Sequence, residues 1–178
     1  MQLILHLNAR FQPKHRFELE DALHEILQKN NAGEITGGGT SLKENGEIDS
    51  CDIEINFSND EKSLDWLVNL LNSIGIPKGS VLQGIEPPIN VGVLEGLALY
   101  LNGTDLPRKI YKECDVNFAI EQLEQSIDGI GHMYSYRELD KFTALYFYGR
   151  SFSAMKEKMD PFISSYPLCQ KCRIEQIA

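Results

Sequence analysis

The sequence predicts an α+β fold made of two tandem ferredoxin-like β-α-β-β-α-β units packed as one compact body, each with its helices on one face of an antiparallel sheet. Three observations predict it. Apolar residues alternate with polar ones in strand-like segments, they recur at helical spacing between those segments, and the order of segments in the first half returns in the second. We therefore divide the chain into halves at 1–86 and 87–178.

In the first half, alternation over 2–7 places three leucines on one face of a strand. Strict alternation over 51–57 marks the clearest strand of the chain. Apolar residues at helical spacing predict a helix over 16–30. The remaining predicted elements are a short strand at 34–39, a helix capped by Ser58 or Asn59 with Asp60 and Glu61 in its first turn, and a strand at 80–85.

The second half repeats this order after a proline-containing connector. The pattern predicts a strand at 93–101 and a helix marked by Val116, Ile120, Leu123 and Ile127. A strand pair follows at 131–136 and 143–148, then a helix capped by Ser151, then a strand at 172–177.

Three consecutive glycines, 37–39, lie between two predicted strands. A phosphate-binding loop opens into a helix whose N-terminus meets the anion, and no helix follows here. The pattern therefore favours a β-bulge, or a place where another backbone approaches closely.

The charge balance limits the possible partners. Lys and Arg number 17 and Asp and Glu 26, giving a net charge of -9 and a pI near 4.9. Nucleic acids and anionic membranes bind basic surfaces, so this balance argues against both and favours a basic protein. No apolar run reaches the roughly 20 residues of a membrane span. The N-terminus shows no signal-peptide pattern, so we expect a cytoplasmic protein.

Neighbouring first and third strands would bring His6, and beyond it Arg10, close to Asp52, Glu54 and Asn56 on a polar sheet face. The residues permit three interpretations: a solvated face with ordinary cross-strand pairs, a partner-binding surface, or a catalytic or metal site. We take these five residues as candidate partner-binding residues.

Four tyrosines gather in the predicted strand pair of the second half. Tyrosine is enriched at interfaces, and it also packs well across neighbouring strands, so both roles stay open. We add them to the partner-binding candidates: Tyr134, Tyr136, Tyr146 and Tyr148.

No hydrolase or metalloprotease signature occurs in the chain, so we predict no catalytic residue, no resident metal and no cofactor. Cys169 and Cys172 form a C-x-x-C pair that fits inert thiols, half of a zinc site or a redox pair. The sequence favours inert thiols. Whether the chain is an enzyme stays open, with a non-enzyme favoured.

Several stretches resemble a family of small uncharacterised bacterial proteins: Leu5-His6-Leu7-Asn8-Ala9-Arg10, Gly37-Gly38-Gly39-Thr40, Cys51-Asp52-Ile53-Glu54, Leu99 to Pro107 and Tyr166-Pro167-Leu168-Cys169. That family has the general character of the immunity proteins of polymorphic toxin and contact-dependent growth inhibition systems. The resemblance implies an acidic, cytoplasmic protein that neutralises a basic toxin domain by binding it.

We therefore predict a protein-binding inhibitor of this toxin–antitoxin kind, present as a monomer or a homodimer. The alternative is a sensor for a small molecule or a metal, or an enzyme, with a site between the two halves.

Overall fold

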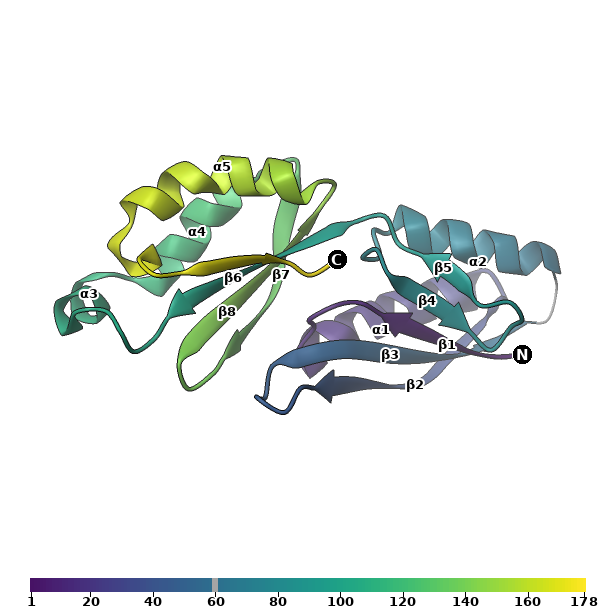
Figure 1. Cartoon of the computed structure of the whole chain (residues 1–178). Coiled ribbons are helices and arrows are strands. Elements are labelled where there is room, and N and C mark those ends of the chain that lie inside the picture. The colour runs from purple at the N-terminus through teal and green to yellow at the C-terminus, as the bar shows by residue number, and fades with distance from the viewer. Residues whose placement is uncertain (59–60) are drawn as a thin grey trace. The chain divides into compact units, whose positions relative to one another are not determined.

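A computed structural model describes residues 1–58 and 61–178. The chain divides into two compact units, Met1–Leu94 and Glu95–Ile177, and each has one antiparallel sheet with helices on one face (Figure 1). The predicted fold class of two tandem ferredoxin-like units is confirmed. The predicted packing of the two halves as one body stays a prediction.

The first unit forms a five-stranded sheet in the order β2-β3-β1-β4-β5, which is the ferredoxin-like arrangement with one strand added at an edge (Figure 1). Helices α1 and α2 connect the strands in the β-α-β-β-α-β pattern. The elements are β1 (Gln2–Leu7), α1 (Pro13–Lys29), β2 (Gly33–Leu42), β3 (Ile48–Phe57), α2 (Glu61–Ser73), β4 (Ser80–Gln83) and β5 (Ile89–Val91).

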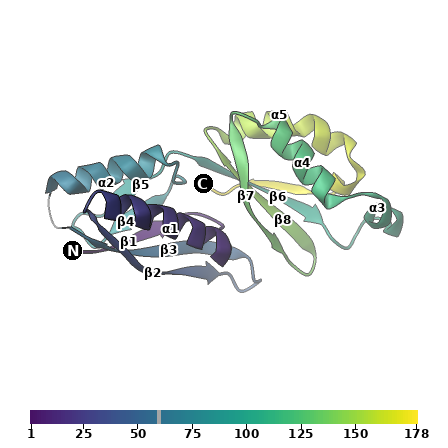
Figure 2. The ribbon, with the colours of Figure 1, turned by 180° about the vertical axis from the view of Figure 1, so that it is seen from behind.

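Alternation determines which face of this sheet the helices cover. The three leucines of β1 are fully buried, and so are Ile53 and Ile55 of β3, because they point toward α1 and α2. Figure 2 shows α1 lying across this face. The helix begins at Pro13, whose fixed φ and missing N–H suit the first helical turn. It therefore starts three residues before the predicted position.

The second unit has a four-stranded sheet in the order β7-β8-β6-β9, the same arrangement as the first four strands of the other unit. Helices α4 and α5 lie on one face of it (Figure 2). The elements are β6 (Glu95–Asn102), α3 (Arg108–Glu113), α4 (Val116–Ser126), β7 (Gly131–Glu138), β8 (Phe142–Gly149), α5 (Phe152–Ser165), a 3-10 turn (Pro167–Cys169) and β9 (Arg173–Gln176).

The core of the second unit lies between its sheet and these helices. Leucines 97, 99 and 101 of β6 face Leu123 of α4 and Met155 of α5. Both helices begin with a side-chain cap. The carboxylate of Asp115 accepts a hydrogen bond from the amide of Asn117, and the hydroxyl of Ser151 accepts one from the amide of Ala154, as predicted for Ser151.

The boundary between the units falls between Leu94 and Glu95, eight residues beyond the predicted division at 86 and 87. The reason is β5, which pairs with β4, and the bridge between Leu94 and Pro77. These pairings tie 87–94 to the first sheet rather than to the second.

Two further elements differ from prediction. Strand β2 runs to Leu42 instead of ending at Gly39, so the glycines lie inside a strand. Helix α3 was not predicted between the strand at 93–101 and the helix marked by Val116. At the start of α2, the hydroxyl of Ser58 donates to the carbonyl of Asn31. The predicted roles of Asn59, Asp60 and the side chain of Glu61 lie outside the described residues.

Within the described part of the chain, no helix combines the length and the apolar character needed to cross a membrane.

Candidate functional site

The face of the first sheet that points away from α1 and α2 is polar, and we call it the open face. The strand register defines it, because directly opposed residues share a face. Its members are Gln2, Ile4 and His6 of β1, Glu34, Gly37 and Gly39 of β2, Asp52, Glu54 and Asn56 of β3, and Val81 and Gln83 of β4.

His6 and Asp52 form the closest polar contact on the open face. They lie directly opposite each other on β1 and β3, and His6 Nδ1 is 2.8 Å from Asp52 Oδ1. Their side chains are 38% and 47% exposed, so water screens the interaction and the pair adds at most about 1 kcal/mol to stability. Its main effect is to orient the Asp52 carboxylate.

The second carboxylate, Glu54, lies between an exposed isoleucine and a glycine. Ile4 is opposite Glu54 on β1 and is 38% exposed, while Gly37 is opposite it on β2. Further along, Asn56 Nδ2 donates to Glu34 Oε1 at 3.4 Å. The open face therefore combines an apolar centre at Ile4 with carboxylates around it.

Of the predicted site residues, the structure brings His6, Asp52, Glu54 and Asn56 together on the open face. Arg10 lies outside it. Strand β1 ends at Leu7, so Arg10 follows in the loop before α1, where its side chain is half-buried.

The glycines of β2 separate into two groups. A Cβ on Gly39, opposite Asp52, would meet no atom within 4 Å, and a Cβ on Gly37 would only touch the Glu54 carboxylate. Gly38 points to the helix side, where a Cβ would collide with Glu20 of α1 and come within 2.6 Å of the carbonyl of Asp52. The predicted bulge is present, as the register shifts between Ile35 and Gly37.

The sequence did not reveal that the residues directly opposite Asp52 and Glu54 on β2 are both glycines, Gly39 and Gly37. The side chain of Thr36 still lies beside Glu54, because its hydroxyl donates to the Glu54 carbonyl at 3.4 Å. The two glycines and the two carboxylates are each spaced i, i+2 in the sequence, which is consistent with their facing one another. This inference also requires the register between β2 and β3, which the sequence does not provide.

The four tyrosines occupy different environments. Tyr146 and Tyr148 are fully buried, whereas Tyr134 and Tyr136 are 37% and 39% exposed. The ring of Tyr134 meets that of Tyr148 edge to face, with centroids 5.6 Å apart. Tyr136 lies opposite Leu145 of the helix-side core. The register of β7 on β8 shifts between Met133 and Ser135, so the alternation of sheet faces along β7 is interrupted between Tyr134 and Tyr136.

Three of the cysteines, Cys51, Cys169 and Cys172, have the properties of protected thiols. Burial, followed by the neighbouring thiols of Cys172 and Cys114, raises the pKa of Cys169 to about 12. Burial also raises the pKa of Cys51 and of Cys172. The thiolate is the form that binds metals and attacks electrophiles, so these shifts support inert thiols. Among the residues that the structure describes, no three His, Cys, Asp or Glu side chains are placed to hold a metal ion.

Comparisons with known proteins add little. No protein-family model matches the chain, and no curated protein matches it. Two solved structures align with nearly all of it, each at 10% sequence identity. The first two RRM domains of a yeast poly(U)-binding protein align over 99% of both chains with a TM-score of 0.27. An anthrone oxidase-like protein aligns over 99% of this chain and 93% of its own with a TM-score of 0.26. At these scores neither similarity carries a functional argument, and the fold class follows from the strand order itself.

Proposed function

We propose that this chain is a protein-binding inhibitor of the immunity type, which neutralises a basic toxin domain by binding it through the open face of the first sheet. One observation carries the proposal: the exposed carboxylates of Asp52 and Glu54 lie beside an exposed isoleucine in the middle of the sheet.

The composition of the open face suits protein recognition. Interfaces place apolar contacts at the centre of the buried patch and polar groups around it. Ile4 supplies the apolar contact, while Asp52 and Glu54 lie beside it on β3. A partner that covers Ile4 would also remove water from the carboxylates, which favours partners that bring cationic side chains to meet them.

The charge of the chain supports a basic partner. With a net charge of -9 the protein attracts cationic surfaces, and such attraction speeds association and weakens as salt is added. The Asp52 carboxylate is already held by His6, so less side-chain freedom is lost when a partner binds.

The proposal is tested by capture from the native host. The tagged full chain is used as bait, and the retained proteins are identified by mass spectrometry. We expect one basic protein to be enriched repeatedly, and to lose its toxicity in the presence of the chain. Repeated recovery of no basic partner would contradict the proposal.

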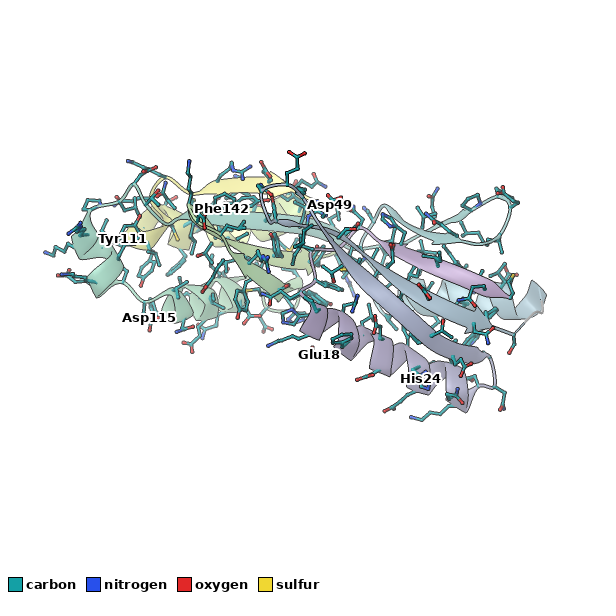
Figure 3. The ribbon with its side chains drawn as sticks, turned by 90° about the horizontal axis from the view of Figure 1, so that it is seen from below. Glu18, His24, Asp49, Tyr111, Asp115 and Phe142 are labelled. Atoms are coloured by element: carbon teal, nitrogen blue, oxygen red, sulfur yellow. The ribbon has the colours of Figure 1, made fainter. Side chains whose placement is uncertain are left out.

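A matched pair of variants tests the face. Asp52→Asn/Glu54→Gln removes two carboxylates from the open face, and Glu18→Gln/Asp21→Asn removes two from the exposed side of α1. Glu18 is labelled in Figure 3. We expect the first variant to weaken partner binding by at least about tenfold at low salt. The second should change it by less than about threefold. Equal losses would mean that net charge, not the open face, determines binding.

The alternative of a small-molecule or metal sensor, or an enzyme, has no observation of the described residues in its favour. A thermal-shift screen with divalent metals and metabolites tests it, because a ligand at a hundred times its dissociation constant adds about 2.7 kcal/mol of stability.

A further inference from the structure

We infer that the outer edge of β2 pairs with an extended segment of the partner that carries Lys or Arg at alternate positions. Its basic side chains would pass over Gly37 and Gly39 to reach Glu54 and Asp52. The inference rests on the proposed function and specifies how the basic partner is held.

Strand β2 is the least protected sheet edge in the described residues. It has ten residues and contains no Pro, Lys or Arg, and its two register shifts, after Ile35 and after Ser41, leave 37–41 in regular pairing with β3. The other edge strands are β5 and β9, with three and four residues, and β7, which carries an Arg and a register shift near its middle. Figure 1 shows β2 at the end of the first sheet opposite to β4 and β5.

The direction of the backbone groups of β2 follows from one hydrogen bond. The amide of Phe57 donates to the carbonyl of Met1, so every second residue of β3 bonds toward β1. Asp52 and Glu54 alternate with those residues, so their backbone N–H and C=O groups bond toward β2, where they pair with Gly39 and Gly37. Residues 38 and 40 therefore direct their backbone N–H and C=O groups to the outer edge.

A second hydrogen bond agrees with this assignment of the outward-directed backbone groups. Ile35 lies on the outward-directed side before the bulge, and its amide donates to His24 Nδ1 of α1 at 3.2 Å. The helix thus satisfies the outer edge at Ile35. Beyond the bulge, the outward groups of Gly38 and Thr40 are placed to receive another strand, which is the binding mode called β-augmentation.

The glycines determine which side chains the incoming strand needs. Its residues opposite Gly37 and Gly39 would lie on the open face, two strand spacings, or roughly 9.5 Å, from Glu54 and Asp52. Over Gly39 the path is clear, because a Cβ there has nothing within 4 Å. At Gly37 the Glu54 carboxylate itself lies 3.4 Å from the position of a Cβ, so the group to be met is already above the glycine. A long cationic side chain can cross this path and meet the carboxylate.

Two probe peptides of identical composition and charge test the inference. Both are capped eight-residue peptides of alternating Lys and Thr. One peptide is N-methylated at its Thr residues, whose amides would otherwise oppose Gly38 and Thr40 and bond to them. The other is N-methylated at its Lys residues, whose amides would face away from β2. Amide chemical shifts of the ¹⁵N-labelled full chain report binding.

We expect the Lys-methylated peptide to shift the amides of 37–42, and the Thr-methylated peptide to bind at least about tenfold more weakly, because it lacks the hydrogen bonds to the edge. Thr40→Pro should weaken the first peptide similarly, since it removes an outward N–H but no backbone bond to β3. Thr40→Val is the matched control, because both variants lose the contact of the Thr40 hydroxyl with Cys51 Sγ, and it should not weaken the peptide.

The remaining outcomes overturn the inference. Equal binding of both peptides that is lost in Asp52→Asn/Glu54→Gln would mean that the open face binds cations without strand pairing, and the proposed function would stand. Binding of neither peptide would exclude the edge as a site for basic strands, while capture tests the proposed function independently. A wild-type dimer that Thr40→Pro dissociates would show that the edge receives a second copy of this chain.

Discussion

The amide of Ile35 donates a hydrogen bond to Nδ1 of His24, and this contact fastens α1 to the start of β2. His24 is labelled on α1 in Figure 3. The bond gives a structural role to a histidine that the sequence presents as a solitary residue.

Replacing His24 by Ala should leave the Ile35 amide without its side-chain acceptor. We expect a loss of about 1–2 kcal/mol in the free energy of unfolding, and faster hydrogen exchange at Ile35 than in the wild type. His24→Asn keeps an acceptor on a shorter side chain and should recover part of the protection. Unchanged exchange at Ile35 in the alanine variant would show that the bond is not formed in solution.

Two adjacent glycines of β2 should respond oppositely to alanine. In Gly38→Ala the new Cβ collides with Glu20 and approaches the carbonyl of Asp52, so we expect a destabilisation of about 1–3 kcal/mol. Gly39→Ala places its Cβ in open space and should be neutral, or stabilising by up to about 1 kcal/mol. Urea denaturation of both variants measures the difference. Equal effects would contradict the packing of α1 over Gly38.

Cys169 should resist alkylation in the folded protein. Its pKa of about 12 keeps it protonated at pH 8–9, where an ordinary thiol is partly ionised. We expect iodoacetamide to label it slowly in buffer and rapidly in urea, as followed by mass spectrometry. Fast labelling of folded protein at pH 8 would contradict this.

The same shift has a consequence for stability at alkaline pH. The folded-state pKa of Cys169 lies above the unfolded value near 9, so the folded protein binds this proton more tightly. Its contribution to stability is complete below pH 9 and is lost as the pH rises toward 12. Cys169→Ala should therefore show a smaller fall in melting temperature between pH 8 and pH 10.5 than the wild type. An equal fall in both proteins would contradict the shift.

The cap of α5 should be measurable by itself. Ser151→Ala removes the hydroxyl that accepts from the amide of Ala154, and we expect a loss of about 1 kcal/mol. Ser153→Ala, on an exposed position in the first turn, is the matched control and should change stability by less than about 0.5 kcal/mol. Similar values for the two variants would mean that the cap contributes little.

Much of the fold could be predicted because the spacing of apolar side chains differs between strands and helices. Strand β3 and the helices α4 and α5 show unambiguous periodicity, and Ser151 marks a helix start by its chemistry. Strand β2 was predicted too short, since glycines carry no side chain and thus no alternation. Strand β5 was missed because three residues after two prolines are too few to form a pattern.

The candidate site could be predicted only where it follows from register. Neighbouring first and third strands bring His6 opposite Asp52, as the sequence suggested. Arg10 lies beyond the end of β1, so strand geometry does not determine its position. The sequence also could not predict that Tyr146 is buried while Tyr134 is exposed. A one-residue register shift in β7 changes which tyrosines share a face of the sheet.

The three-residue strand β5 limits how the first sheet can be extended. It pairs along β4 and leaves only three residues as a template at that end, whereas β2 offers the longer stretch 37–42 beyond its bulge and the bond of Ile35 to His24. A sheet with two long free edges can join copies without limit, as in a fibre, but a sheet with one such edge is complete once that edge is filled. The strand pairing that we infer would therefore add one partner strand to the first sheet.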